Sequence, residues 1–206
     1  MNEPKSEVFN MDCMEGMKQF PDKYFDLAIV DPPYGIGVNM NIGRRKGKGK
    51  KHDDKEWDDC SPETDYFIHL FRISQNQVIW GSNNFDLPTS QYFCVWDKGE
   101  TIYGRDFAEC ELAYVRSGGT RIFKRSPNQD DRIHPTQKPV DLYKWLLKNY
   151  AKPGDKILDT HLGSQSSRIA AFDMGFDFTG YELDADYFRD GCKRFEQHKV
   201  QLKLFV

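Results

Sequence analysis

The sequence lacks the features that mark several common classes of protein. No apolar run approaches membrane-spanning length, and the N-terminal residues lack the apolar core of a secretory signal. No internal repeat is visible. The cysteines are scattered and never form a C-x-x-C pair, and His52, Cys60 and His69 have no zinc-ligand spacing. These absences favour a cytoplasmic protein with reduced thiols and without a metal site.

A large excess of charge of either sign is also missing. The 206 residues carry a formal net charge of −3, which excludes a chain that binds nucleic acid with its whole surface; such binding would need a local patch. Hydrophobic residues make up 38% of the chain and aromatic residues 14%, enough for a packed core. We therefore expect a single domain over residues 1–206.

Apolar runs and helical patterns alternate along the chain. Strands are expected at residues 8–9, 25–30, 77–80, 92–96, 111–115, 156–159 and 178–181, the fifth of these at a sheet edge. Helices are expected at residues 14–20, 66–71, 139–150 and 168–174, and a last one is expected to bury Phe188, Cys192 and Phe195. Residues 116–133 are predicted to be a polar loop. This alternation predicts an α/β fold with a doubly wound, mostly parallel sheet.

The most informative motif is Asp31-Pro32-Pro33-Tyr34, directly after the apolar run at residues 25–30. Proline fixes φ and has no N–H, so the backbone leaves the sheet rigidly and nearby carbonyl oxygens stay free to accept hydrogen bonds. Asp31 and the Pro32 carbonyl would each accept one hydrogen of an exocyclic amino group, while Tyr34 stacks on the ring that carries it. Because α/β sheets bind ligands at the carboxyl ends of their strands, the motif predicts a nucleobase site.

A second candidate site lies in the last third of the chain. Asp159 ends one predicted strand, Gly163 follows in the turn, and Glu182 ends the next strand. Glycine lets the backbone approach a ligand before a helix N-terminus, and the second acid is placed to accept ribose hydroxyls. An ordinary strand–turn–helix connection has the same pattern, so both interpretations stay open.

The missing phosphate motifs narrow the choice of ligand for this second site. The sequence has no G-x-G-x-x-G, and no glycine-lysine-[Ser/Thr] follows the strand, which argues against a dinucleotide and against ATP. An adenosine ligand without a pyrophosphate is S-adenosylmethionine. Asp159 could then face its methionine ammonium, because carboxylates pair with cations.

Three motifs occur in a fixed order: residues 31–34, then 133–139 (Ile-His-Pro-Thr-Gln-Lys-Pro), then 159–164 (Asp-Thr-His-Leu-Gly-Ser). In this order the chain resembles the β-class amino-methyltransferases of DNA, from about Asn10 to Phe195. The resemblance implies the Rossmann-like fold of S-adenosylmethionine-dependent methyltransferases with a circularly permuted motif order. A catalytic half at residues 7–134, with a basic loop at 35–56, would precede a cofactor-binding half at 135–206, without a separate target-recognition domain.

The resemblance also implies roles for individual residues. The catalytic motif would be Asp31, Pro32, Pro33 and Tyr34. The residues expected to contact the cofactor are Asp12 and Cys13 beside its adenine, Thr136, Gln137 and Lys138 in a segment that closes over it, Glu182 at the ribose, and Asp31, Asp159, His161, Gly163 and Ser164. In the basic loop, DNA phosphates would contact Arg44, Arg45, Lys46, Lys48, Lys50 and Lys51, for which a solvated surface loop is the alternative.

The chain departs from the family pattern in the turn after residue 159. The family usually has Asp-Pro-Phe-x-Gly-Ser-Gly, whereas Thr160 and His161 here replace Pro-Phe, and Gln165 replaces the last glycine. His161 is planar and can still stack on a cofactor. Gln165 has less backbone freedom than glycine, which puts the affinity for the cofactor in doubt.

The expected activity is methylation of the adenine N6 amino group in DNA, because Asp-Pro-Pro-Tyr in relatives goes mostly with adenine. Cytosine N4 is the near alternative, since those enzymes often begin the motif with serine. A DNA-binding or regulatory relative that has lost turnover is the alternative of another class. The expected partner is DNA, and a homodimer, a specificity partner and a companion restriction nuclease all stay open. The resemblance implies a bacterial or phage-encoded cytoplasmic protein.

Overall fold

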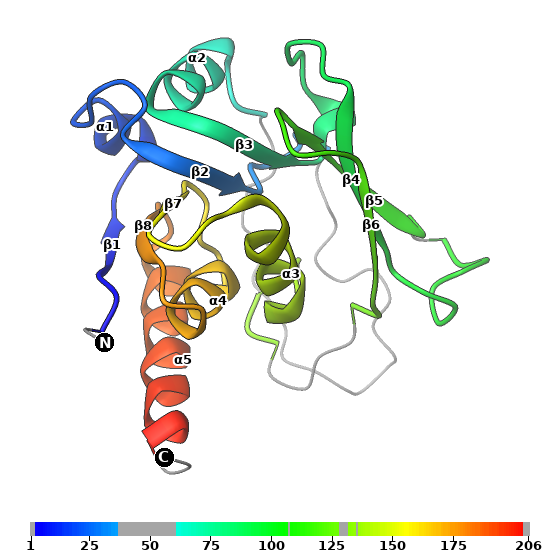
Figure 1. Ribbon diagram of the computed structural model, residues 1–206. Coiled ribbons are helices and arrows are strands. Elements are labelled where there is room, and N and C mark those ends of the chain that lie inside the picture. The colour runs from blue at the N-terminus through cyan, green and yellow to red at the C-terminus, as the bar shows by residue number, and fades with distance from the viewer. Residues whose placement is uncertain (1–2, 37–60, 107, 128–131, 135, 204–206) are drawn as a thin grey trace.

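The computed structural model describes residues 3–36, 61–106, 108–127, 132–134 and 136–203. One eight-stranded sheet carries helices on both faces (Figure 1). The strands are β1 (Ser6–Asn10), β2 (Phe25–Val30), β3 (Ser74–Trp80), β4 (Tyr92–Asp97), β5 (Cys110–Val115), β6 (Arg121–Lys124), β7 (Lys156–Asp159) and β8 (Asp177–Glu182). The helices are α1 (Cys13–Met17), α2 (Thr64–Ile73), the 3-10 turn η1 (Ser82–Asn84), α3 (Val140–Tyr150), α4 (Ser166–Asp173) and α5 (Ala185–Lys203). Within the described part of the chain, every helix is too short or too polar to span a bilayer.

The strand order is β1-β8-β7-β2-β3-β5-β4-β6. The first five strands are parallel, β5 runs antiparallel to both β3 and β4, and β6 pairs in parallel with β4. Strands that alternate with covering helices in this way form a Rossmann-like, doubly wound sheet. The predicted fold class is confirmed.

Two predictions about the second half of the sheet are wrong. The strand at 111–115 does not lie at an edge, because β5 sits between β3 and β4, although its Leu112 stays 39% exposed. Part of the predicted loop at 116–133 is the edge strand β6. Ile122 in β6 is 68% exposed, so this short strand lacks the buried alternation that would reveal it in the sequence.

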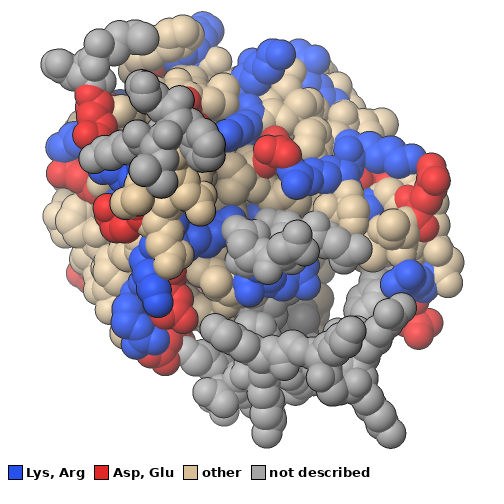
Figure 2. Space-filling model, turned by 90° about the horizontal axis from the view of Figure 1, so that it is seen from below, with Lys and Arg blue, Asp and Glu red and all other residues tan. Residues whose placement is uncertain are grey.

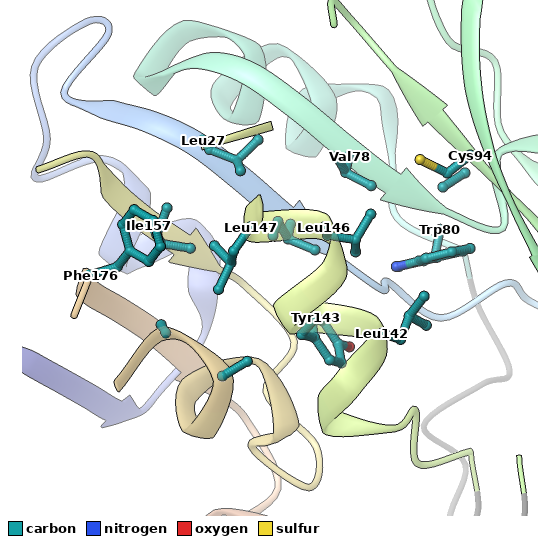
Figure 3. Close-up of a cluster of buried hydrophobic side chains, with 14 of the residues drawn as sticks. Leu27, Val78, Trp80, Cys94, Leu142, Tyr143, Leu146, Leu147, Ile157 and Phe176 are labelled. Atoms are coloured by element: carbon teal, nitrogen blue, oxygen red, sulfur yellow. The ribbon is translucent and has the colours of Figure 1, made fainter. Parts of the chain in front are cut away.

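Alternate residues of the central strands enter two separate hydrophobic cores. Leu27 and Ile29 of β2 pack in the core beneath α3 and α4, where Leu142 and Leu146 of α3 point toward the sheet (Figure 3). Residues of β2 between them belong to the second core, with α1 and α2. This period of two is expected of a strand that is buried on both faces.

The last helix is rotated slightly from its predicted orientation. In α5 Phe195 is buried as expected and Tyr187 is buried as well, whereas Phe188 and Cys192, which we also expected to be buried, are only half-buried. The Arg168 guanidinium of α4 lies 3.8 Å from the centre of the Phe195 ring. This contact secures α5 against α4 through a cation–π interaction.

The sheet brings four predicted site residues together along the edge that is formed by the carboxyl ends of its parallel strands. Asp12 follows β1, Glu182 ends β8, Asp159 ends β7 and Asp31 follows β2, and these four strands are parallel neighbours. The chain leaves β7 toward β8 and leaves β2 toward β3, in opposite directions. Asp159 and Asp31 therefore flank the topological switch point, where open α/β sheets bind ligands.

Candidate active site

Both oxygens of the Asp31 carboxylate are engaged by neighbouring side chains. The Tyr34 hydroxyl donates to Oδ1 at 2.6 Å, and the Lys138 ammonium donates to Oδ2 at 2.5 Å. A carboxylate oxygen has two lone pairs, so each oxygen can accept one more hydrogen bond. The side chain retains 18% exposure. Asp31 is thus held in one orientation at the end of β2 with acceptor capacity left for an amino group.

Tyr34 lies in a close-fitting aromatic corner. Its ring meets Phe85 edge-on, with centroids 6.0 Å apart, and burial raises the pKa of its hydroxyl well above the ordinary value. Gly81, which follows β3, has φ +68°, and a Cβ there would lie 2.1 Å from Tyr34 Cε1. Glycine is therefore required at this position both for the left-handed backbone and for the ring.

We expect Gly81→Ala to displace the Tyr34 ring and lower methyl transfer, with a loss of about 1–3 kcal/mol in the free energy of unfolding. Gly175→Ala is the matched control, because Gly175 has φ +77° and nothing lies within 4 Å of a Cβ there. The control bears the backbone strain alone. Urea denaturation and a labelled-methyl assay measure the two effects, and equal stability and activity in both variants would contradict this role of Gly81.

The buried Lys138 links two acidic side chains. Besides its contact with Asp31, its Nζ lies 3.0 Å from Glu111 Oε2, and Glu111 Oε1 lies 2.8 Å from Lys98 Nζ. Burial by itself would raise the pKa of Glu111, but the ammonium groups of Lys138 and Lys98 outweigh burial and lower this pKa to about 2. Burial lowers the pKa of Lys138, but the two carboxylates outweigh it and the pKa is raised. The sequence predicts Lys138 over the cofactor but gives no role to Glu111 or Lys98.

Asp159 is a buried carboxylate with neutral partners. Only 2% of the residue is exposed. The Ser167 hydroxyl donates to Asp159 Oδ2 at 2.5 Å, and the His161 backbone N–H donates to Oδ1 at 3.0 Å. Burial raises the pKa of Asp159 to about 7. Among the residues that the structure describes, no lysine or arginine pairs with it. A buried acid in this state is suited to receive a cationic ligand group.

Glu182 secures the turn that follows Asp159. Its Oε2 accepts the Gly163 N–H at 2.7 Å and its Oε1 accepts the Asp184 N–H at 2.9 Å. Gly163 has φ +48°, and burial raises the pKa of Glu182. The predicted contact with a ribose stays a prediction, for which each carboxylate oxygen has a further lone pair.

The departures from the family pattern have visible compensations. Gln165 has φ +59°, a conformation that favours glycine, but its side chain is fully buried and bonded. Its Nε2 donates to the Phe188 carbonyl at 3.3 Å, and its Oε1 accepts from the Arg168 guanidinium at 2.9 Å. A Cβ on Gly191 would lie 2.7 Å from Gln165 Cγ, so this glycine makes the room. Hydrogen bonds thus offset the backbone strain of about 1–2 kcal/mol.

Thr160 and His161 form a hydrogen-bonded chain with α2. The Tyr66 and Thr160 hydroxyls lie 2.7 Å apart, and Thr160 Oγ1 lies 3.0 Å from His161 Nδ1. Burial lowers the pKa of His161 to about 4, so its ring is neutral at pH 7. The ring meets Tyr66 edge-on at 5.4 Å. His161 is therefore fixed as a neutral planar group, and its stacking on a cofactor stays a prediction.

The segment around Thr136 and Gln137 crosses the Gly163 turn. The His134 ring packs on Tyr187 with centroids 4.3 Å apart, and a Cβ on Gly163 would lie 3.6 Å from it. Thr136 Oγ1 lies 3.2 Å from His134 Nδ1, and Gln137 Oε1 accepts the Ile133 N–H at 3.0 Å. Together with Lys138, the segment contacts both candidate halves of the site.

Three other residues that are predicted to contact the cofactor lie at the start of α1 and in the turn before α4. Asp12 caps α1, where its Oδ1 accepts the Met14 N–H at 2.8 Å, and burial raises the pKa of the Cys13 thiol to about 12. The Ser164 hydroxyl lies 3.1 Å from Ser166 Oγ, and its carbonyl accepts from Arg194. Cys13 is therefore a neutral thiol near the end of β1, and the carbonyl of Ser164 anchors the turn to α5.

The predicted phosphate contacts fall outside the described residues. These are Arg44, Arg45, Lys46, Lys48, Lys50 and Lys51 of the basic loop. On the described surface seen from below, lysine and arginine side chains lie beside acidic ones rather than forming a face of one sign (Figure 2). The grip on DNA phosphates therefore stays a prediction from the sequence.

The comparisons with known proteins agree with this geometry. A family model described as DNA methylase matches residues 88–193. The chain is 36% identical to DNA adenine methyltransferase YhdJ of Escherichia coli K12 over 248 residues, covering 95% of this chain and 84% of that protein. Its fold is similar to that of M1.HpyAVI in complex with SAM (19% identity, TM-score 0.58, 91% of this chain and 98% of that chain). It is also similar to the cytosine-N4-specific PvuII DNA methyltransferase (12% identity, TM-score 0.61, 97% and 94%).

The fold is that of the Rossmann-like methyltransferases to which the chain is similar, and a row of acids lies at the ends of its parallel strands. The chain belongs to the DNA methylase family whose members modify the N6 or N4 amino groups of bases.

Proposed function

We propose that the protein transfers a methyl group from S-adenosylmethionine to the N6 amino group of adenine in DNA. The observation that carries the proposal is the Asp31 carboxylate, fixed at the end of β2 with acceptor capacity toward an amine. The adenine preference is supported by the relative from E. coli, which is named a DNA adenine methyltransferase, and by the Asp-Pro-Pro-Tyr motif.

The residues around Asp159 fit the proposed cofactor. A buried carboxylate without a cationic partner among the described residues suits the cofactor's ammonium group, and Glu182 beside Gly163 suits a ribose. When bound, S-adenosylmethionine supplies a methyl group on a positively charged sulfur. Residues 7–134 would then serve the base and residues 135–206 the cofactor, within one domain.

The amino nitrogen of adenine is a poor nucleophile because its lone pair is delocalised into the ring. Asp31 and the Pro32 carbonyl, by accepting its two hydrogens, hold electron density on nitrogen and favour its tetrahedral geometry. The nitrogen would contribute the electron pair of the new N–C bond and lose one proton to water. The electrons of the bond between the methyl carbon and sulfur would stay on sulfur. The acceptors strengthen as positive charge grows on nitrogen, so they lower the barrier.

The target base inside a duplex is out of reach and must be flipped out, at a cost of a few kcal/mol. Stacking on Tyr34 offsets part of this cost, since base–aromatic stacking contributes roughly 1–3 kcal/mol.

The decisive experiment identifies the modified nucleoside. The protein is incubated with unmethylated genomic DNA and labelled cofactor, the DNA is digested to nucleosides, and the product is identified by mass spectrometry. N6-methyladenine supports the proposal, and N4-methylcytosine would favour the alternative that the similarity to the PvuII enzyme suggests. Absence of any product, together with absence of cofactor binding in calorimetry, would instead indicate an inactive DNA-binding relative.

We expect the basic loop to bind DNA phosphates beside the flipped base. A dimer partner, a specificity protein or a companion nuclease would act in addition to this contact. Replacing Arg44, Arg45, Lys46, Lys48, Lys50 and Lys51 by glutamine should make the negative slope of log K against log salt shallower by up to about 5, because each phosphate contact releases counterions. Filter binding from 50 to 300 mM salt measures the slope. A slope equal to that of the wild type would show that the loop is a spectator.

A further inference from the structure

The antiparallel strand β5 delivers a second acid to the catalytic edge. Because β5 runs against β3 and β4, its first residues lie at the edge where β3 and β4 end: Trp80 of β3 pairs with Ala113, and Trp96 of β4 pairs with Glu111. Lys98 follows β4 at the same edge. The strand order therefore places Glu111 and Lys98 beside the end of β2, although both are far from Asp31 in the sequence.

The four groups form a row of alternating charge: Asp31, Lys138, Glu111 and Lys98, joined by contacts of 2.5, 3.0 and 2.8 Å. Lys138 is nearly inaccessible to solvent, with 3% of its side chain exposed. The side chains of Glu111 and Lys98 are mostly covered, with exposed fractions of 22% and 15%. Charges so far removed from water interact more strongly than surface pairs. The row sums to zero, so its field at the reacting amine depends on how Lys138 is shared.

We infer that Glu111 is a positioning residue for the transfer reaction: it shares the Lys138 ammonium with Asp31, so that Asp31 keeps enough negative charge to stabilise the amine as it becomes positive. The inference rests on the proposed function. It assigns Lys138 to the catalytic carboxylate as well as to the segment over the cofactor. The Trp80 and Tyr34 rings, 5.5 and 6.0 Å from the ammonium, limit its alternative positions.

Removing the charge of Glu111 should leave Asp31 as the one carboxylate of the row that pairs with the Lys138 ammonium. In Glu111→Gln the row carries a net positive charge, which opposes a transition state that gains positive charge on nitrogen. We expect the single-turnover rate at saturating cofactor to fall about tenfold, with the Kd of the cofactor changed less than about threefold. Gln has the size of Glu and can still bond Lys98, so folding is preserved.

The second substitution distinguishes charge sharing from a structural role. Lys138→Met removes the shared ammonium and provides the background for this test: if Glu111 acts through Lys138, adding Glu111→Gln to Lys138→Met should change the rate less than about threefold. A merely structural glutamate would instead lower the rate by the same factor in both backgrounds. Glu109→Gln is the matched control, because it makes the same charge change two residues away, where the exposed Glu109 side chain accepts the Gly104 N–H.

Single-turnover transfer from labelled cofactor to unmethylated genomic DNA, with cofactor Kd from calorimetry, provides both readouts. A rate loss from Glu111→Gln that is absent in the Lys138→Met background, with Glu109→Gln at the wild-type rate, supports the inference. An unchanged rate in Glu111→Gln, or an equal loss in both backgrounds, overturns it while leaving the proposed function intact. Failure of the wild type to methylate any DNA would overturn both.

Discussion

Asp31→Asn is expected to reduce methyl transfer by at least about 100-fold, the size of effect seen when one charge-stabilising group is removed from an active site. Asparagine preserves the shape and one carbonyl acceptor of Asp31 but removes its negative charge. Lys138 would still be paired with Glu111, so the buried ammonium is not left alone. The loss should therefore fall on the rate of transfer rather than on folding, as single-turnover kinetics and thermal denaturation can show.

Asp22→Asn is a suitable control for this experiment. Asp22 makes an ion pair with Arg72 on the surface, and its side chain is 75% exposed, so its replacement changes the net charge equally without touching the catalytic edge. Its rate should equal that of the wild type. Turnover by Asp31→Asn within tenfold of the wild type would show that Asp31 does not hold the reacting amine.

The acids at the strand ends could be predicted from the sequence because they depend on local patterns. Each follows a short apolar run, and parallel neighbouring strands bring their carboxyl ends together regardless of connection details. Asp31, Asp159 and Glu182 were found in this way, and the structure places all three at one edge. Their roles toward base and cofactor stay predictions that the experiments above test.

The row from Asp31 to Lys98 could not be predicted because it depends on non-local strand order. Glu111 joins it only because β5 is inserted between β3 and β4, and the sequence favoured an edge position for that strand. Pairing partners of strands are not encoded in hydrophobic periodicity, which reports only which face is buried. A single signal was present: a glutamate near the start of an otherwise apolar strand that carries no obvious solvent face.

Asp159→Asn is expected to weaken binding of S-adenosylmethionine about 100-fold and at the same time to stabilise the free protein. The buried carboxylate has a pKa of about 7, well above its ordinary value, because burial disfavours its charge. An acid whose pKa is raised by folding binds its proton more tightly in the folded state. The resulting stabilisation is fully present below the unfolded-state pKa of 3.8 and is lost progressively as the pH rises from there through 7.

The stabilising effect of Asp159→Asn should therefore depend on pH. Asparagine removes the cost of the buried charge and can still accept the His161 N–H and bond the Ser167 hydroxyl, which can rotate to accept. At pH 8 we expect the free energy of unfolding to rise by roughly 1–3 kcal/mol, and at pH 4 to change little. Urea denaturation at the two pH values measures this difference.

Cofactor binding should show the converse pH dependence in the wild type. Since the ammonium group requires the ionised carboxylate, affinity should fall about tenfold per pH unit below pH 7, with uptake of the released proton by buffer visible in calorimetry. Asp155→Asn, in the turn before β7, where the carboxylate accepts the Lys152 N–H, is the control and should retain this profile. Stability that drops at pH 8 in Asp159→Asn, or affinity that stays at the wild-type value, would mean that this carboxylate is structural. A gain in stability coupled to a loss of affinity would instead identify Asp159 as a charge that the free fold tolerates because the ligand neutralises it.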